Sequence, residues 1–277
     1  MSESSHSIAP TIGVFDSGFG GLTVLRALIE KLPRARFAFV GDTARLPYGS
    51  KSRRTIARYA SQSAQFLVNE QGAEYLVIAC NTASALALDA IQEAVPVPVL
   101  GVIEPGATAA FAASKTNDVL VIATDATVQS QAYTAACRAQ GLRALEKACP
   151  LLVPLVEEGW TDHPVTEEVI DIYLNELRAE AWARGLNPDT LVLGCTHYPL
   201  LRRLIERAVR PGVKVIDSAE ATATVAAQMF DGRGSGEASE QTEIRCFATD
   251  SVEKFERLGS RFLGRPVGKV ELLDLGG

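Results

Sequence analysis

Two cysteines, Cys80 and Cys195, each directly follow a short apolar run that is typical of a buried strand. The surrounding segments are similar, since residues 76–82 are LVIACNT and residues 191–197 are LVLGCTH. Chance similarity of two core strands is the alternative. Ligands of open α/β sheets bind at the carboxyl ends of strands, so both thiols are predicted to face a ligand site.

A thiol in such a place can act as a base, an acid or a nucleophile. The residues after Cys80, including Asn81 and Thr82, can cap and open a helix, and we expect a helix N-terminus to lower the pKa of that thiol. If the chain stays extended after Cys195, His197 projects to the same side and can tune the protonation of the thiol. A packing role in the core is the alternative for His197.

The remaining cysteines, Cys137, Cys149 and Cys246, are predicted to be packing residues in a helix, a loop and a late strand. Five cysteines form an odd set without a C-x-x-C pair. This pattern supports neither a disulfide framework nor a zinc ribbon. We therefore expect reduced thiols and no metal.

Two further turns carry polar groups. In the first, Asp16 and Ser17 end an apolar run and lead into a glycine-rich turn, which can bind a carboxylate or phosphate at a helix N-terminus. The glycine spacing is not that of a dinucleotide fold and no P-loop follows, so a nucleotide is not expected. Helix capping is the alternative for Asp16. In the second turn, residues 41–49 form either a surface loop or, through Tyr48 and Gly49, part of a pocket.

The elements that position these residues are apolar runs separated by helical patterns. Such runs indicate strands of parallel sheets that are covered on both faces. The class is therefore α/β and doubly wound. Helices are predicted over 22–32, where Pro33 ends the pattern, over 166–184 and over 252–263. The predicted strands are residues 12–15, 37–40, 75–79, 97–100, 119–123, 191–193, 213–216 and 243–249.

Composition bounds the class of partner. The chain of 277 residues is 47% hydrophobic and 22% charged, which fits a packed globular protein. Its net charge is −6 and its basic residues are scattered, so nucleic acid is not an expected partner. No apolar run is long enough to span a membrane, and the start MSESSHSIAPT does not resemble a signal peptide. We expect a cytoplasmic protein.

Two similar α/β domains are predicted to face each other across a cleft, with one thiol on each wall. The first domain comprises residues 1–100 plus 214–277, because the last strand and helix are too short to form a domain and are expected to return. The second domain comprises residues 101–213. The Gly- and Ser-rich segment 231–240 is predicted to be a linker or exposed loop.

Five motifs follow one another along the chain: FDSGFGGLTVL (15–25), GDTARLPYGSKS (41–52), ACNTASA (79–85), CPLLVPLVEEG (149–159) and LGCTHYPLL (193–201). Together and in this order they make the chain resemble the bacterial glutamate racemases, a cofactor-independent family of aspartate and glutamate racemases. The matches extend from residue 12 to about residue 218. The paired C-N-T and C-T-H motifs are much more specific than any single glycine loop.

The resemblance implies interconversion of L- and D-glutamate without pyridoxal phosphate, metal or nucleotide, which supplies D-glutamate for peptidoglycan. It also implies a homodimer. Cys80 and Cys195 would be the acid/base thiols, the former acting on D-glutamate and the latter on L-glutamate. Asp16 would assist Cys80, and Glu157 and His197 would assist Cys195. The residues implied to hold the amino acid are Asp16, Ser17, Tyr48, Gly49, Asn81, Thr82, Thr124, Thr196 and His197.

The chemistry of the residues agrees with this resemblance. A racemase removes the α-proton from one face and delivers a proton to the other, which requires two groups on either side of a plane. One thiol must begin as a thiolate and the other as a thiol. Because the α-proton is a weak acid, the pocket must also stabilise negative charge away from water.

Other activities remain open at this point. A related two-cysteine racemase or lyase would act on aspartate, hydantoins or malonates. A hydrolase would use Cys195 and His197 for nucleophilic catalysis and would need one cysteine only. A small-molecule-binding or partner-inhibiting protein would keep its function without either thiol.

Overall fold

The protein, represented by a computed structural model, is described over residues 9–230 and 242–276. Within these residues the strands form a six-stranded and a four-stranded sheet, and every strand pairing is parallel. The first sheet contains β1 (Thr11–Asp16), β2 (Arg36–Gly41), β3 (Tyr75–Ile78), β4 (Val99–Gly101), β9 (Ile244–Ala248) and β10 (Val270–Leu272). The second sheet contains β5 (Asp118–Ala123), β6 (Arg143–Ala148), β7 (Thr190–Gly194) and β8 (Lys214–Asp217).

The two sheets repeat one strand order. The second sheet runs β6-β5-β7-β8, and the first sheet contains the equivalent run β2-β1-β3-β4, to which β9 and β10 are added beside β2. The strand order reverses between β1 and β3 in the first sheet and between β5 and β7 in the second. Doubly wound sheets bind ligands at this position. Cys80 follows β3 and Cys195 follows β7, so the two thiols lie after equivalent strands, each beside the reversal point of its sheet. The predicted fold class is confirmed.

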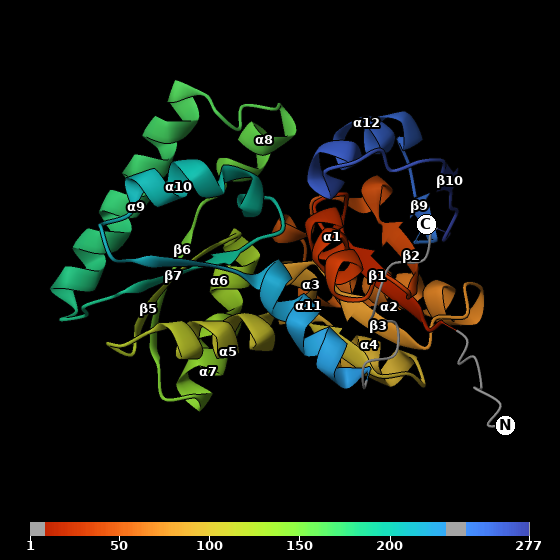
Figure 1. Cartoon of the computed structure of the whole chain (residues 1–277), viewed down its shortest axis with the longest axis horizontal. Coiled ribbons are helices and arrows are strands. Elements are labelled where there is room, and N and C mark those ends of the chain that lie inside the picture. The colour runs from red at the N-terminus through yellow and green to blue at the C-terminus, as the bar shows by residue number, and fades with distance from the viewer. Residues whose placement is uncertain (1–8, 231–241, 277) are drawn as a thin grey trace, which may run out of the picture.

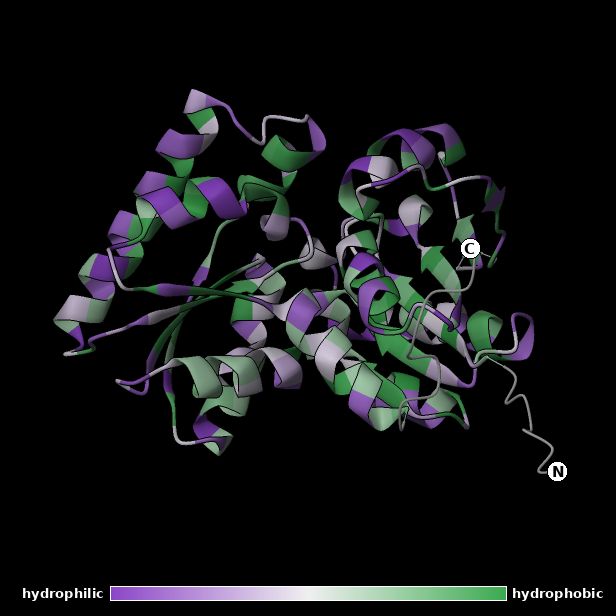
Figure 2. Cartoon of the chain, viewed as in Figure 1, coloured by the Kyte–Doolittle hydropathy of each residue, from purple (hydrophilic) through white to green (hydrophobic). Residues whose placement is uncertain are grey.

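Helices separate the strands and cover both faces of each sheet (Figure 1). Strands β1, β5 and β7 are buried along their whole length, because helices exclude water from both faces. Figure 2 shows the same pattern, with apolar strands inside and polar residues on the outer faces of the helices. The helices are α1 (Leu22–Lys31), α2 (Arg53–Asn69), α3 (Asn81–Leu86), α4 (Leu88–Ala94), α5 (Ile103–Ala113), α6 (Asp125–Ser130), α7 (Ala132–Ala139), α8 (Leu152–Glu157), α9 (Pro164–Ala183), α10 (Arg202–Ala208), α11 (Ser218–Met229) and α12 (Val252–Leu263).

Local sequence explains where the longer helices begin and end. Pro164 occupies the first turn of α9, where its missing N–H is not needed, and His163 Nδ1 accepts from the Val165 N–H at 3.2 Å. Gly185 ends this helix with a φ of 65°, and Gly264 follows α12 with a φ of 76°. The helices predicted over 22–32, 166–184 and 252–263 are confirmed within one or two residues at each end.

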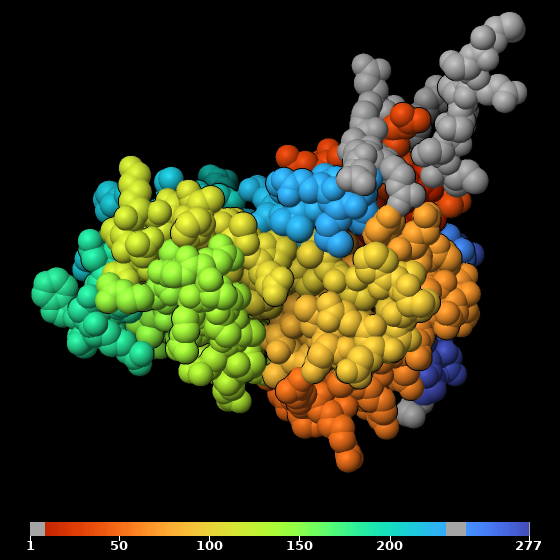
Figure 3. Space-filling model, turned by 90° about the horizontal axis from the view of Figure 1, so that it is seen from below, coloured from red at the N-terminus to blue at the C-terminus, as the bar shows by residue number. Residues whose placement is uncertain are grey.

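The chain passes between the two sheets through α5 and α11. Helix α5 follows β4 and leads to the second sheet, and α11 leaves β8 and packs against α1 and α5. Figures 1 and 3 show α11 lying between the two halves, next to the segment that contains α5. We call the halves the first and second lobes, after their sheets. The C-terminal elements β9, α12 and β10 lie in the first lobe.

Every predicted strand is present in the structure, and two strands were not predicted, β6 and β10. Strand β8 pairs with β7 and so extends the second sheet past the predicted boundary at residue 213. The predicted linker at 231–240 lies outside the described residues. Over the described ranges, no helix combines the length and apolar character that a membrane span needs.

Candidate active site

The Cys80 thiol lies at the junction between β3 and α3. Cys80 is the N-cap of α3, where its Sγ accepts from the Ala83 N–H at 3.4 Å, and the thiol donates to Ser17 Oγ at 3.4 Å. The helix predicted after Cys80 is therefore confirmed, but its N-cap is Cys80 itself and not a residue that follows it. The predicted lowering of the pKa is wrong, because burial and the nearby charge of Asp16 raise the pKa of Cys80 to about 12. The raised pKa favours the thiol form of Cys80.

Asp16 ends β1 and is almost fully buried. Its Oδ2 accepts from the Gly18 N–H at 3.0 Å, while its Oδ1 has no hydrogen-bond partner. Burial raises the pKa of this carboxyl, and the positive charge of His197 and backbone N–H groups offset only part of that effect. The alternative role of Asp16, helix capping, is not observed, since α1 begins after Gly21 without a side-chain cap.

Cys195, His197 and Glu157 form a chain of polar contacts in the second lobe. His197 Nδ1 lies 4.0 Å from Cys195 Sγ, and His197 Nε2 lies 3.3 Å from Glu157 Oε1. The extended chain considered in the sequence analysis is not observed after Cys195. The chain turns, and the helical backbone of His197 brings its ring back beside the thiol.

This arrangement favours the protonated form of His197. Burial disfavours the charge, but hydrogen bonds to Cys195 and Glu157, with the negative charges of those groups, raise the pKa of His197 to about 10. The pKa of Glu157 is lowered although burial opposes this, because Glu157 accepts from His197 and pairs with Lys254 at 3.5 Å. His197 is therefore suited to stabilise a thiolate.

Both thiols line a single cavity of about 260 Å³ between the lobes. One wall comes from the segments that follow β1, β2 and β3, and the other comes from α8, Pro150 ahead of it and the turns that follow β5 and β7. Among the residues that the sequence predicts for the site, only Asp16 does not line this cavity. The predicted residues that line it are Ser17, Tyr48, Gly49, Cys80, Asn81, Thr82, Thr124, Glu157, Cys195, Thr196 and His197.

Polar contacts join the two walls beside the thiols. The Tyr133 hydroxyl of α7 donates to Asn81 Oδ1 at 2.7 Å, which leaves the Asn81 Nδ2 group buried without a partner. Thr23 of α1 donates to the Thr196 carbonyl at 3.1 Å. Gly20 is needed at this contact, because a Cβ there would lie 2.6 Å from His197 Nδ1. The first lobe thus fixes the position of His197.

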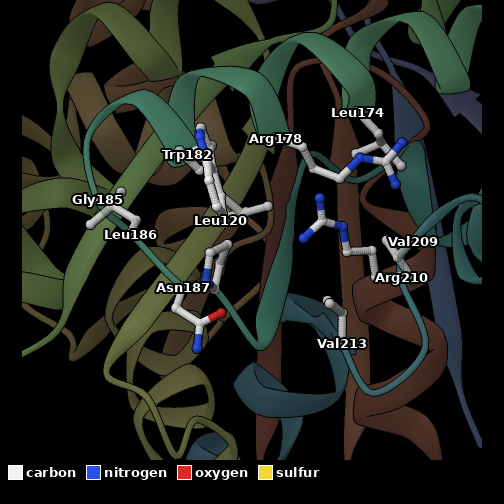
Figure 4. A pocket seen from close by; sticks show the side chains of 12 residues that line it. Leu120, Leu174, Arg178, Trp182, Gly185, Leu186, Asn187, Val209, Arg210 and Val213 are labelled. Carbon is white, nitrogen blue, oxygen red and sulfur yellow. The ribbon is translucent and has the colours of Figure 1, made fainter.

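A second, larger cavity of about 390 Å³ lies at the far side of the second lobe (Figure 4). Its walls are mostly apolar, and Arg178, Arg210 and Trp182 project around it. Of the residues that the structure describes, no cysteine, histidine, aspartate or glutamate lines this cavity. Of these two cavities, the one between the lobes holds the side chains suited to acid/base chemistry. Among the described residues, no group of three or more histidine, cysteine, aspartate or glutamate side chains is arranged to hold a metal ion.

Sequence reasoning missed part of the cavity wall. Asp125, Pro150, Val153 and Pro154 also line the cavity. Pro150 to Pro154 lie within the CPLLVPLVEEG motif, which therefore carried a signal for them. Lys254 had no such signal, because α12 meets Glu157 only through the folding of the C-terminal segment onto the first lobe.

The fold and the cavity define a two-lobed α/β protein in which each lobe supplies one thiol to a shared ligand site, an arrangement suited to proton transfer on two faces of a small molecule. A sequence model described as Asp/Glu/Hydantoin racemase matches residues 12–226. The chain belongs to this family.

Individual relatives are similar over nearly their whole length. The chain is 53% identical to a glutamate racemase of Koribacter versatilis, with 97% of this chain and 98% of the relative covered. The glutamate racemase of Francisella tularensis in complex with D-glutamate superimposes with a TM-score of 0.85 at 35% identity, over 97% of this chain and 99% of that one. The Thermus thermophilus glutamate racemase in complex with β-chloro-D-alanine gives 0.83 at 43% identity, over 97% and 98%.

Proposed function

We propose that this protein is a glutamate racemase that interconverts L- and D-glutamate with two thiols. The observation that carries the proposal is that Cys80 and Cys195 line one cavity and that each comes from a different lobe. The identity of relatives such as the Koribacter versatilis protein, which bears this name, supports glutamate as the substrate.

A two-base reaction requires one thiol to begin as a thiolate and the other as a thiol. We assign Cys195 as the thiolate, stabilised by the His197 imidazolium, and Cys80 as the thiol. With L-glutamate, the Cα–H bond breaks and an S–H bond forms on Cys195. The S–H bond of Cys80 breaks, and its proton forms a new Cα–H bond on the opposite face. The reverse direction begins from D-glutamate with the protonation states exchanged.

The groups around Cys80 fit its thiolate form at the end of the turnover. The Ala83 N–H already points at its sulfur, and the Ser17 hydroxyl can donate after the thiol has lost its proton. Asp16 lies behind Cys80, where its buried carboxyl opposes a lasting negative charge on the sulfur. We propose that Asp16 thereby favours the thiol form of Cys80 over the thiolate.

Polar groups on both walls are available to the amino acid. Asn81 offers a buried N–H donor without a partner, which suits a carboxylate oxygen. Donors close to the reacting carbon would also stabilise negative charge in the transition state. We propose that the substrate is held by Ser17, Tyr48, Gly49, Asn81, Thr82, Thr124, Thr196 and His197, with Asp16 acting from behind the wall.

Deuterium exchange with matched variants tests this proposal. L-Glutamate is incubated with the purified protein in deuterated buffer without added cofactor, and optical rotation and Cα deuterium are followed. Cys80→Ala and Cys195→Ala are compared with Cys137→Ala, which removes a buried thiol of α7 that does not line the cavity. We expect racemization with deuterium at Cα, lost in the first two variants and kept in the third.

The same experiment separates the alternatives. No reaction of glutamate by the folded wild-type protein would overturn the proposal, and aspartate, hydantoins and malonates would be tested next. A hydrolase would lose activity with Cys195→Ala but not with Cys80→Ala. Equal activity of all variants would exclude both thiols from the chemistry.

Further proposals come from the family. We propose that the protein supplies D-glutamate for peptidoglycan in the cytoplasm and forms a homodimer. We also propose that residues 1–100 with 214–277 form one domain and residues 101–213 the other. The position of β9 and β10 in the first sheet supports this division. The pairing of β8 with β7 supports a second boundary a few residues later than residue 213.

A further inference from the structure

The carboxylate of Asp42 lies behind the cavity wall and is fully buried. Asp42 follows β2 at the carboxyl edge of the first sheet, where its backbone N–H donates to the Asp16 carbonyl at 3.0 Å. Asp42 does not itself line the cavity. Any effect of Asp42 on the site must therefore act through its neighbours.

One oxygen of this carboxylate holds a residue of the cavity wall. The Tyr48 hydroxyl donates to Asp42 Oδ2 at 2.5 Å, and Tyr48 lines the cavity. A phenol hydroxyl carries a single hydrogen, and that of Tyr48 is used in the bond to Asp42. Tyr48 can therefore offer only its oxygen lone pairs to any other group. The Tyr48 ring lies against Phe15, with 6.1 Å between ring centroids. Both the ring and the hydroxyl of Tyr48 are thus held in place.

The other oxygen fixes Asp42 to two more distant elements. Arg45 Nε donates to Asp42 Oδ1 at 2.8 Å, and the Thr249 hydroxyl donates to the same oxygen at 2.9 Å. Arg45 also donates to Gln62 of α2 at 2.7 Å, and its guanidinium lies 4.2 Å from the centre of the Tyr59 ring. Because Thr249 directly follows β9, the carboxylate is held by both α2 and the C-terminal segment.

We propose that Asp42 is a positioning residue for racemization, which fixes Tyr48 and thereby the cavity wall formed by residues 46–50. This inference rests on the proposed function. A carboxylate suits the position because it accepts from all three side-chain donors and presents no donor of its own.

The variant Asp42→Asn keeps the shape of the side chain but changes its hydrogen-bonding character. If the amide oxygen faces Arg45 and Thr249, the amide N–H groups face Tyr48, and the phenol hydrogen must turn away toward the cavity. We expect KM for glutamate to rise about tenfold and kcat to change by less than about threefold, because a binding surface is altered while the thiols are not.

A double-mutant cycle separates this role from a merely structural one. Steady-state kcat and KM are measured for the wild type, Asp42→Asn, Tyr48→Phe and the double variant. If Asp42 acts through Tyr48, the double variant raises KM by about the same tenfold as each single variant, whereas independent effects would multiply to about a hundredfold.

The matched control is Asp118→Asn. Asp118 is also a buried carboxylate, which binds Arg143 at 2.6 and 2.7 Å, but it lies at the opposite end of β5 from the cavity. We expect this control to lose stability without a change in KM. An unchanged KM in Asp42→Asn, or a multiplicative double variant, would overturn the inference.

Other outcomes separate this inference from the proposed function. If Asp42→Asn does not fold, Tyr48→Phe alone carries the test, and a wild-type KM in that variant overturns the inference. An inactive wild-type protein overturns the proposed function, and this inference with it. An active wild type with unaffected variants overturns this inference only.

Discussion

The hydroxyls of Thr82 and Thr124 lie 3.0 Å apart, although these residues belong to different lobes. Thr82 is in the first turn of α3, next to Cys80, and Thr124 is the N-cap of α6. The Thr127 hydroxyl lies 2.9 Å from Thr124 and 3.3 Å from Thr82, which completes a triangle of hydroxyls. Since Thr82 and Thr124 also line the cavity, one contact both joins the lobes and shapes the site.

Replacing one member of this triangle should weaken substrate binding more than chemistry. Thr124→Val keeps the shape but removes the hydroxyl, so we expect KM to rise about fivefold to tenfold and stability to fall by about 1 kcal/mol. Thr134→Val is the control, because its hydroxyl donates to Glu146 at 2.7 Å away from the cavity. Steady-state kinetics and chemical unfolding measure both effects. An equal rise in KM for the control would contradict this expectation.

The raised pKa of His197 predicts a dependence of stability on pH. A folded-state pKa of about 10, above the ordinary value of 6.5, gives stability that is fully present below about pH 6.5 and is lost as the pH rises toward 10. The unfolding free energy of the wild type should therefore exceed that of His197→Gln most at pH 6, and this difference should shrink by pH 10. A difference that is constant over this range would show that His197 is not protonated.

Glu157→Gln should move the alkaline limb of the activity profile. Burial disfavours the charge of His197, and the hydrogen bond and negative charge of Glu157 help to overcome this effect. Without that charge, we expect the pH at which kcat/KM falls to move about one pH unit lower. Glu158→Gln serves as the control, because its side chain does not line the cavity. Profiles that superimpose would exclude Glu157 from this role.

The ion pair between Lys254 and Glu157 should contribute modestly to kcat/KM, and this contribution should decrease as the salt concentration rises. Lys254 is 45% exposed, so its ion pair at 3.5 Å is screened by solvent. We expect Lys254→Met to lower kcat/KM about twofold to fivefold at low ionic strength, with a smaller difference from the wild type in high salt. Arg53→Met, which removes a more exposed ion pair with Asp89, should have no such effect.

Gly20→Ala tests whether close contact between the lobes positions His197. The added Cβ would lie 2.6 Å from Nδ1 and 2.7 Å from Cε1 of His197, and it would also meet Thr196 Oγ1. The imidazole or the turn must move, so we expect kcat/KM to fall by about a hundredfold, mainly through kcat. Thermal unfolding shows whether the variant is folded, and a folded variant with wild-type kcat would contradict the prediction.

The sequence predicts most of the fold because the buried strands have a continuous apolar signal. β1 and β5 are buried throughout, whereas β6, with the sequence RALEKA, is mostly half-exposed and carries three charged residues. β10 has three residues at the edge of its sheet. Edge strands of this kind lack the apolar pattern on which strand prediction depends.

The site was predictable where its residues follow strands in recognisable motifs. Cys80 and Cys195 are examples, and the structure places both in one cavity. The pKa of Cys80 was predicted in the wrong direction, because helix geometry is visible in the sequence while burial and the proximity of Asp16 are not. For the same reason the sequence does not reveal the role of Asp42. Its partners Tyr48 and Thr249 are far apart along the chain, but both donate to its carboxylate in the folded protein.

The last strands of the chain complete the first sheet, and this has a consequence for biosynthesis. β9 pairs with β2, so the β2 edge keeps unpaired backbone groups until residues 242–276 leave the ribosome. The second sheet is built from the continuous segment 118–217, so it contains no strand that is synthesised after residue 217. We therefore expect the second sheet to be finished first during translation, and a chain that stalls before β9 to expose an edge open to aggregation.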